Sequence, residues 1–473
     1  MPNQCEGTPE NASRILGFLQ EALEPDAGLV LVGGAVRDRL LGRGGGDWDL
    51  ATALLPEAVM ARAKKAGLRV IPTGLQHGTV TVLLEGRPVE ITTYRGDGTY
   101  LDGRRPESVR LGVALEEDLA RRDFTVNAMA LPIEAMGRSD WREHLVDPFG
   151  GQADLEAGLL RAVGDPLARF QEDGLRPLRA CRFAAQLGFG MEPGTLAAIP
   201  QRLEVAQKVS VERVFQEMNK LLCGKDAPVG LRLLERSGLL DLWMPELRPL
   251  VGCVQNRYHD LDAWEHTLAV VAAIPAEPVL RWAALLHDLG KPGSRSLGPD
   301  GAAHFFGHEA LSVRLAGNLL GRLKISRALL EAVLGLVRHH GQRPSAQWGN
   351  AACRRLLARL EGDKVPLDTW AELRRADIRG RKEPSEAMQQ EFETELQRIR
   401  QLAETKPPLV ARDLALNGTE LMDRLARPGG PWLGQLQAHL LDQVLEHPAV
   451  NNPEDLARLA SEWLASEALR ARE

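Results

Sequence analysis

A short segment near the start of the chain combines an apolar strand, a glycine pair, a helix and two closely spaced aspartates. Residues 29–32 are apolar and predict a strand, and Gly33-Gly34 predicts a tight turn into a helix that begins near Ala35. Because glycine has no side chain, backbone N–H groups at this turn can approach phosphate oxygens, and the helix dipole also favours an anion there. The segment therefore predicts an α/β unit that holds a phosphate at its first turn.

Two carboxylates follow the glycine turn, at Asp47 and Asp49. In an extended strand alternate side chains share a face, so both carboxylates project together while Trp48 and Leu50 turn into packing. Paired carboxylates can hold divalent metal ions that activate an attacking hydroxyl and neutralise a triphosphate as pyrophosphate leaves. The two aspartates are therefore candidate catalytic and metal-binding residues, with Mg²⁺ as the expected ion.

Each part of this pattern also has a purely structural explanation. Glycine pairs are common in turns between strands and helices, and an Asp-x-Asp pair is often a solvated loop. The order of the parts favours chemistry, because the glycine turn, Arg37 on the helix and the paired carboxylates can together handle one triphosphate.

Strand and helix patterns alternate through about the first 130 residues. Residues 79–84 and 89–93 predict two strands joined by a hairpin-like connection. Glu90 on the second strand joins the two aspartates as a third carboxylate if the strands are neighbours, and it is otherwise a salt-bridged surface residue. Residues 94–112 are polar and glycine-rich and predict a mobile surface loop.

Three later segments extend the pattern, at residues 121–129, 172–183 and 210–213. Taken in order with residues 31–50, they resemble the motifs of the class II tRNA nucleotidyltransferase and bacterial poly(A) polymerase family. The CCA-adding members of that family build the 3′ end of tRNA without a nucleic-acid template. The resemblance covers about the first half of the chain, and motifs in a fixed order are far more specific than any single motif.

The second motif, residues 121–129, implies contacts with the sugar and phosphates of a nucleotide. Arg122 and Asp123 are expected to bind triphosphate and a ribose hydroxyl, with Asn127 supporting them. The alternative for Asp123 is an ordinary helix cap. Residues 94–112 look like the flexible loop of the members that add the terminal A, which argues against an enzyme that adds only C.

Residues 172–183 resemble the family's base-reading helix. One face of this helix is expected to carry residues at spacings of four, three and four, namely Glu172, Arg176, Arg179 and Phe183. A carboxylate accepts from the exocyclic amine of C or A and an arginine donates to ring acceptors, so Asp173 with Arg176 would imitate a partner base. The alternative is an amphipathic helix with internal salt bridges.

Pro177 replaces the apolar helix former that the family usually has at this position. A proline inside a helix removes a hydrogen bond, whereas the first turn has no such bond to lose. The helix is therefore expected to begin near Asp173 or Gly174. The predicted nucleotide-binding residues are Gly33, Gly34, Arg37, Arg122, Asp123, Asn127, Asp173, Arg176, Arg179 and Arg182, and the predicted catalytic carboxylates are Asp47, Asp49 and Glu90.

The second half of the chain is rich in histidine and aspartate that suit a divalent metal site. The candidates are His266, His287, Asp288, His304, His308, His339, His340 and Asp377. This part resembles an HD-type phosphohydrolase domain, whose four-residue metal signature matches His266, His287, Asp288 and Asp377. The resemblance implies a second divalent metal, but a bound metal does not by itself imply turnover.

A length of 473 residues is too great for one core and predicts several domains. Helical patterns continue from about residue 151 almost to the C-terminus. We expect an α+β multidomain protein with an N-terminal polymerase-beta-like nucleotidyltransferase α/β domain and a mostly α-helical remainder. The expected divisions are a head domain at residues 1–150, a helical neck and body for base reading and RNA binding at 151–245, an HD-type metal-binding domain at 250–383 and a helical tail at 384–473.

The net charge of −6 excludes a generic nucleic-acid-binding protein, because neutralising phosphates needs clustered Lys and Arg. RNA contacts must therefore be local. Basic pairs such as Arg121-Arg122 and Arg354-Arg355 are candidates, with solvated helix faces as the alternative. The five cysteines lack paired spacing and no apolar stretch reaches the length of a membrane span, so a cytoplasmic protein with no membrane partner is expected.

The leading prediction is a template-independent RNA nucleotidyltransferase that adds CMP and AMP, or AMP alone, to the tRNA 3′ end by two-metal transfer. Its expected partners are the tRNA 3′ end, ATP and CTP. A poly(A) polymerase shares the same motifs. The alternative from another class is an HD-type RNA phosphohydrolase whose N-terminal half only binds RNA.

Overall fold

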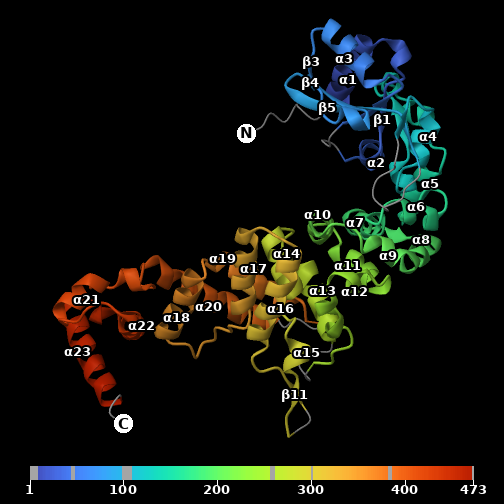
Figure 1. Ribbon diagram of the computed structural model, residues 1–473. Coiled ribbons are helices and arrows are strands. Elements are labelled where there is room, and N and C mark those ends of the chain that lie inside the picture. Colours follow the sequence, from blue (N-terminus) through green and yellow to red (C-terminus); the bar gives the residue numbers. More distant parts are fainter. Residues whose placement is uncertain are drawn as a thin grey trace. The chain divides into compact units, whose positions relative to one another are not determined.

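The computed structural model describes residues 9–43, 48–98, 109–255, 261–299, 302–381 and 386–470, and it divides into two compact units, Met1–Met244 and Pro245–Glu473 (Figure 1). The first unit contains a mixed sheet, and helices make up most of the remaining described chain. The predicted α+β class is therefore confirmed. The boundary expected between the domain that ends at residue 245 and the one that begins at residue 250 lies beside the division into two units. The finer division into four domains stays a prediction.

The first unit is built on a sheet of six strands in the order β3-β4-β5-β2-β1-β8. Neighbouring strands are antiparallel except β2 and β5, which run parallel. The bounds are β1 Val30–Val32, β2 Asp49–Thr52, β3 Arg69–Ile71, β4 Thr79–Leu84, β5 Arg87–Thr93 and β8 Ala130–Pro132.

Side-chain alternation gives the sheet two different apolar faces. Leu31, Leu50 and Ile91 are buried in a core that also takes in residues of helices α1 (Pro9–Leu23) and α3 (Pro56–Lys65). Val32 and Ala51 lie in a second, smaller core with residues of α4 (Leu115–Ala120). Asp49 is two residues before Ala51 on β2, so its carboxylate belongs to the α4 side of the sheet.

The predicted hairpin at β4 and β5 is confirmed, but its turn is tighter than expected. β4 has the predicted bounds, whereas β5 begins at Arg87, so the connection is only Glu85 and Gly86. Both have positive φ, at 49° and 81°. Two left-handed residues in a row match the right-handed twist of the flanking strands, and this pairs two extra residues of β5.

The segment predicted as a mobile loop has ordered ends. Tyr94 is 6% exposed, and its hydroxyl donates a hydrogen bond to the Gly28 carbonyl oxygen. β6 (Arg95–Asp97) pairs antiparallel with β7 (Val109–Leu111). The prediction was therefore wrong at both ends, because polar composition does not reveal that the two ends of the segment pair with each other as strands. Residues 99–108, at the centre of that prediction, lie outside the described residues.

The rest of the first unit is mainly helical. Its helices are α2 Gly34–Leu40, α5 Gly151–Glu156, α6 Pro166–Glu172, α7 Arg176–Leu187, α8 Pro193–Ala198, α9 Leu203–Ala206, α10 Val211–Leu222, α11 Ala227–Arg236 and α12 Leu239–Trp243. Helix α7 packs against both α10 and α11. Its polar face is thereby held on a helical support.

The second unit is almost wholly helical among its described residues. Its helices are α13 Ala263–Ala273, α14 Pro278–Leu286, α15 Lys291–Ser294, α16 His308–Arg322, α17 Arg327–His339, α18 Asn350–Gly362, α19 Leu367–Arg379, α20 Glu386–Glu404, α21 Gly418–Arg424, α22 Pro431–Glu446 and α23 Pro453–Arg470. Between α15 and α16 a small hairpin pairs β11 (Ser296–Leu297) with β12 (Ala303–His304). None of the described helices has the length and apolar character that a membrane span requires.

One of the basic pairs proves to be structural in part. Arg354 on α18 is buried and donates from Nε to the Leu445 carbonyl oxygen at 2.6 Å, which ties α18 to the end of α22. Both alternatives for Arg354, an RNA contact and a solvated helix face, are therefore wrong, because its side chain is buried in contacts within the protein. Its neighbour Arg355 forms ion pairs with Asp442 and Glu446 on α22.

Candidate active site and a second metal-ligand cluster

The glycine turn begins the site. Gly33 has a φ of 68° and precedes helix α2, which starts one residue before the predicted Ala35. A Cβ atom placed on Gly33 would lie 2.7 Å from Nη1 of Arg122. Glycine is therefore favoured here both by the left-handed backbone and by the close approach of the arginine.

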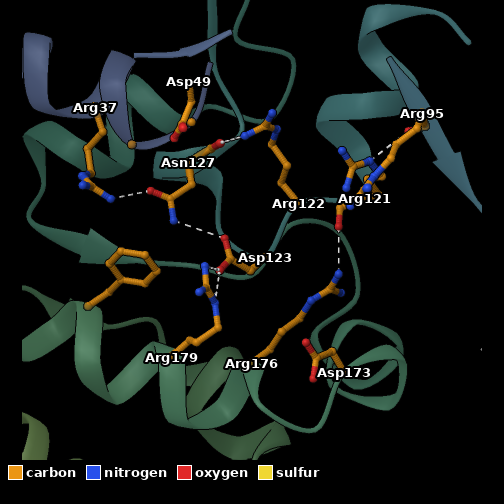
Figure 2. Close-up of a pocket in the computed structure, with 13 residues that line it drawn as sticks. Arg37, Asp49, Arg95, Arg121, Arg122, Asp123, Asn127, Asp173, Arg176 and Arg179 are labelled. Carbon is orange, nitrogen blue, oxygen red and sulfur yellow. Dashed lines mark hydrogen bonds and ion pairs between the residues drawn. The ribbon is translucent and has the colours of Figure 1, made fainter. Parts of the chain in front are cut away.

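A pocket of about 500 Å³ opens beside this turn within the first unit (Figure 2). It is lined by Gly33, Gly34, Arg37, Asp49, Arg95, Arg121, Arg122, Asp123, Asn127, Asp173, Arg176, Arg179 and Phe183. Most of the predicted nucleotide-binding residues are therefore brought together around one cavity. Of the described residues that were predicted for the site, Glu90 and Arg182 are not among those that line it, and Asp47 lies outside the described residues.

A chain of hydrogen bonds crosses the pocket from the glycine turn to helix α7 (Figure 2). Arg37 Nη1 donates to Asn127 Oδ1 at 2.7 Å, and Asn127 Nδ2 donates to Asp123 Oδ1 at 3.2 Å. Arg179 then donates to Asp123 Oδ2 from Nη2 at 2.6 Å and from Nε at 2.8 Å. These contacts orient two arginines, 37 and 179, from opposite sides of one cavity.

Asp123 is the buried centre of that chain. Burial alone would raise the pKa of its carboxyl, but the charge and hydrogen bonds of Arg179, with the Asn127 amide, lower the pKa to about 2. The alternative of a helix cap is wrong: the next helical turn, Thr125–Asn127, has Phe124 at its N-cap. Asp123 is ionised at neutral pH and holds Arg179 in place.

Asp118 on α4 is a structural hub that sequence reasoning missed. It is 1% exposed and accepts from Arg121 Nη2 at 2.6 Å, from Arg122 Nη2 at 3.2 Å and from the Arg95 backbone N–H at 3.1 Å. Burial would raise the pKa of Asp118, and the two arginine charges outweigh this and lower it. The spacing of three and four residues to Arg121 and Arg122 was the available signal.

Helix α7 begins at Arg176, later than predicted. Leu175 is its N-cap, so Pro177 lies in the first turn, where it does not kink the helix, as inferred. Glu172 is the last residue of α6, so its predicted place on the same helix face as Arg176 is wrong. The interruption has a tertiary cause: a Cβ on Gly174 would lie 2.4 Å from the Val205 carbonyl oxygen, so this backbone packs directly on α9.

The predicted base-reading pair is positioned by other parts of the chain. Asp173 Oδ1 accepts from the Leu175 N–H at 2.9 Å, and Oδ2 accepts from Arg213 Nη2 at 3.1 Å. Arg176 forms an ion pair with Glu172 and donates from Nη2 to the Arg121 carbonyl oxygen at 2.9 Å. Both side chains line the pocket with fixed orientations.

Arg182 has a different environment from the other predicted arginines. It is 7% exposed, and Nε lies 2.6 Å from Glu217 Oε2 on α10. Burial lowers the pKa of Arg182 to about 10 against the opposing charge of Glu217. Its guanidinium carbon is 3.6 Å from the centroid of the Phe183 ring. Arg182 therefore packs beneath the pocket lining.

Glu90 was expected to join the two aspartates only if their strands are neighbours, and the structure meets this condition for Asp49. β2 and β5 are parallel neighbours, and Asp49 is the register partner of Glu90. Paired residues of adjacent strands point to the same face, so both carboxylates belong to one side of the sheet. Carboxylate oxygens are the donors that Mg²⁺ prefers, and this donor set fits such an ion.

The four predicted ligands of the second unit converge in its buried interior. His266 lies on α13, His287 and Asp288 follow α14, and Asp377 lies on α19. His266 Nε2 is 3.0 Å from Asp377 Oδ1, and His287 Nε2 is 3.1 Å from Asp288 Oδ2. Burial would raise the pKa of both aspartates, but neighbouring cations and histidines hold each pKa well below its usual range.

Two further histidines complete the cluster. His308 Nε2 and His340 Nε2 lie 3.6 Å and 3.5 Å from Asp288 Oδ1, and 3.1 Å from each other. Two groups result, His266 with His287 and Asp377, and Asp288 with His308 and His340, each with its ligand atoms within 4.8 Å. Imidazole and carboxylate donors in this number fit divalent transition metals. Asp288 connects the two groups, because its Oδ2 lies beside His287 and its Oδ1 faces His308 and His340.

The other two candidate histidines lie outside these two groups. His339 Nε2 is 2.6 Å from Asp363 Oδ2, and the His304 ring stacks on Phe306. Both His308 and His340 were visible as candidates, but the sequence did not show which of the two adjacent histidines at 339 and 340 faces inward.

Three family descriptions match successive parts of the chain. Residues 29–161 match the poly A polymerase head domain, residues 188–250 match the probable RNA and SrmB-binding site of polymerase A, and residues 264–405 match the HD domain.

The chain is also similar to whole proteins over most of their length. The chain is 36% identical to the CCA-adding enzyme of Geobacillus thermodenitrificans over 88% of this chain and 89% of that protein. It is 32% identical to the CCA-adding enzyme of Geobacillus sp. over 96% and 97% of the two chains. Among solved structures, the Bacillus stearothermophilus CCA-adding enzyme in complex with CTP aligns with a TM-score of 0.66 and 28% identity, over 98% and 99% of the chains.

Proposed function

Because the chain belongs to the family of CCA-adding enzymes and is an RNA nucleotidyltransferase of the tRNA 3′ end, we propose that it adds both CMP and AMP to that end without a nucleic-acid template. The observation that carries this proposal is the pocket beside the glycine turn of the first unit. A carboxylate at Asp49, arginines for the phosphates and the Asp173–Arg176 pair for a base all line the same cavity.

The reaction joins the RNA 3′ hydroxyl oxygen to the α-phosphorus of a nucleoside triphosphate. The bond between the α-phosphorus and the bridging oxygen to the β-phosphate breaks, and pyrophosphate leaves. Arg37 and Arg122 lie beside the glycine turn and would bind the phosphates, and the Asp123–Arg179 pair would hold the ribose end. Divalent ions held by Asp47, Asp49 and Glu90 would supply charge neutralisation and hydroxyl activation, and these oxygen donors favour Mg²⁺.

Nucleotide choice is assigned to protein side chains rather than to a template. Asp173 accepts from the exocyclic amine that C and A share, and Arg176 donates to their ring acceptors. Arg213 and Glu172 fix the direction of these two groups through the contacts described above. Because both C and A carry such an amine, one pair can serve both nucleotides.

The deciding experiment uses the full chain and three tRNA transcripts, which end before CCA, after the first C and after both C residues. Each is incubated with CTP, with ATP or with both. Stepwise completion of all three supports CCA addition. Extension of the last transcript alone restricts the activity to A addition. Unlimited A addition to unrelated RNA overturns the tRNA assignment and favours a poly(A) polymerase.

We further propose that the second unit is a metal-dependent phosphohydrolase, on the observation that six buried or half-buried His and Asp side chains converge there. In such a reaction water adds to phosphorus, the ester P–O bond breaks, and an alcohol and phosphate leave. Release of phosphate from a nucleoside monophosphate should cease when a chelator removes the metal and return when Mn²⁺ or Ni²⁺ is added. Phosphate release that is unchanged by the chelator contradicts the proposal.

We propose the cytoplasm as the place of action. Cys181, Cys223, Cys253 and Cys353 are free thiols in the structure, which suits a reducing compartment.

A further inference from the structure

Two arginines gather around one tryptophan at the C-terminal end of helix α2. The guanidinium carbon of Arg39, in the last turn of α2, lies 4.5 Å from the centroid of the Trp141 ring, and that of Arg142 lies 5.4 Å from the same centroid. Arg39 also donates from Nη2 to the Met136 carbonyl oxygen at 2.6 Å. Because an aromatic face attracts guanidinium groups, the half-buried indole holds two positive charges close together. We call Arg39, Trp141 and Arg142 the Trp141 surface.

Among the described residues, no carboxylate balances the charge of Arg39. Its Nε is buried and has no hydrogen-bond acceptor. Burial lowers the pKa of Arg39, and no acidic group of the described chain raises it again. The guanidinium is nevertheless protonated at neutral pH, because the pKa of an arginine lies far above 7. Arg142 is exposed and forms no ion pair with any described residue. The Trp141 surface therefore carries two positive charges that the described chain leaves without a counter-ion.

The acidic residues next to this surface along the chain are occupied by other arginines. Asp38 accepts from Nε and Nη2 of Arg37 at 2.9 and 3.0 Å. Asp140 accepts from Nε and Nη2 of Arg138, both at 2.8 Å. The pKa of Arg138 is raised by these bonds and, to a smaller extent, by the charge of Glu143, which therefore also acts there. Backbone N–H groups cap the last carbonyl groups of α2, which limits the negative charge of the helix end.

An RNA substrate needs a cationic surface outside the active site. The pocket beside the glycine turn has a volume of about 500 Å³, which takes a nucleotide but not a folded RNA. The Arg121-Arg122 pair, a candidate for RNA contacts in the sequence, is held by Asp118. Helix α2 has only seven residues, so Arg39 lies within about 10 Å of the glycine turn along the helix axis. The Trp141 surface is therefore close to the pocket, and its charge is available.

We propose that Arg39 and Arg142, positioned by Trp141, bind phosphates of the RNA substrate that lie upstream of its 3′ end. Arginine contacts to phosphates fix the register of a nucleic acid and carry no sequence information. The surface therefore holds the RNA while nucleotide choice is left to the pocket, which Arg37 of the same helix lines. This inference rests on the proposed function, and it adds a place where the RNA is held outside the active site.

The test measures the binding of a tRNA transcript that lacks CCA, with no nucleotide present, over a range of salt concentrations. Each lost phosphate contact lowers the slope of log Kd against log salt by about 0.7 to 0.9. Arg142→Ala and Arg39→Ala should each show this change and raise the Kd about fivefold, whereas Arg142→Lys, which keeps the charge, should retain the slope. The control is Arg14→Ala, which removes an exposed arginine that pairs with Glu85 and should change neither value. Unchanged Kd and slope in both alanine variants of the surface would overturn the proposal.

Kinetic measurements separate the Trp141 surface from the triphosphate site and from the function on which it rests. In Arg142→Ala the KM for tRNA should rise while the KM for ATP stays unchanged, and a rise in the KM for ATP alone would refute RNA binding by this surface. Wild type that binds tRNA through Arg142 but adds no nucleotide would end the proposed function and leave the surface standing. Nucleotide addition by wild type, together with unaltered tRNA binding in both alanine variants, would do the reverse.

Discussion

The pocket of the first unit and the cluster of the second unit gather charged residues in opposite ways. The pocket is an open cavity lined by six arginines, with Asp49 at its edge, and its arginines are oriented by carboxylates and carbonyl groups behind them. The cluster is buried, and most of its six side chains would act as direct ligands. An open cationic pocket suits a large anion that enters and leaves, whereas a buried His/Asp cluster suits an ion that stays.

The two sites also differ in how the chain builds them. The pocket takes its residues from short motifs in which neighbours along the sequence are neighbours in space, such as Arg121 to Asn127. The cluster takes one or two ligands from each of several helices between α13 and α19. We therefore expect substitutions in the pocket to act through networks of neighbouring groups, and substitutions in the cluster to act on ion binding directly.

Asp49→Asn tests whether the two sites act independently, and it should have the largest effect. Removal of the carboxylate charge at the proposed metal site should lower kcat for nucleotide addition about a thousandfold or more. Phosphate release by the second unit should remain within about twofold of wild type. Addition is measured on a tRNA transcript that lacks only the terminal A. Glu57→Gln on α3, outside the pocket lining, is the control. Retained addition in Asp49→Asn would contradict the proposed site.

Asp288→Asn is the reciprocal test in the cluster. Because Asp288 faces both groups of ligands, its loss should remove most of the bound metal, measured by elemental analysis of the purified protein, and lower phosphate release at least about a hundredfold. Nucleotide addition should be unchanged. Asp363→Asn, which alters a carboxylate that pairs with His339 outside the cluster, is the control. Loss of nucleotide addition in Asp288→Asn would show that the sites are coupled and would end the comparison.

Asp118→Asn tests whether a residue that only orients the pocket arginines affects substrate binding. Asp118 lies behind the pocket and is predicted to touch no substrate, yet its loss leaves two arginines without their buried partner. We expect a KM for ATP about tenfold higher and a free energy of unfolding lower by about 2 kcal/mol, since an unpaired buried charge is destabilising. Glu116→Gln, an exposed acidic residue of the same helix, is the control. An unchanged KM would reduce Asp118 to a purely structural role.

The sequence predicted local elements well and tertiary arrangement less well. The strand at residues 79–84 and the place of Pro177 in the first turn of α7 were predictable, because each depends on a local pattern or on proline geometry. The break between Glu172 and Arg176 was not, because it arises where Gly174 packs on residues of α9 about 30 positions later in the chain. A single segment does not contain that contact.

The candidate sites show the same limit. Motif order indicated most of the pocket lining, and residue type indicated the metal cluster. The inward direction of His340 rather than His339 depends on the rotation of α17 at its last turn, which periodicity leaves open at a helix end. Asp118 was hidden for a related reason, since one of its partners is the backbone N–H of Arg95, on a strand 23 residues earlier.

The smallest expected effect is a pH dependence of the unfolding free energy that distinguishes Asp123, buried beside the pocket, from a surface carboxyl. The pKa of Asp123 is about 2 in the folded chain, below the ordinary value of 3.8, because Arg179 overcomes the effect of burial. The ionised group therefore stabilises the fold fully above about pH 4, by about 2 kcal/mol, and this contribution is lost as the pH falls from 4 through 2. The free energy of unfolding of wild type minus that of Asp123→Asn should shrink over this window. The control is Asp165→Asn, whose carboxylate is exposed and caps α6, compared with wild type in the same way.

The difference in unfolding free energy between wild type and Asp123→Asn could instead stay constant between pH 5 and pH 2.5. That result would mean that the Asp123–Arg179 pair does not set the pKa of Asp123, and the network of contacts inferred for the pocket would lose its central contact.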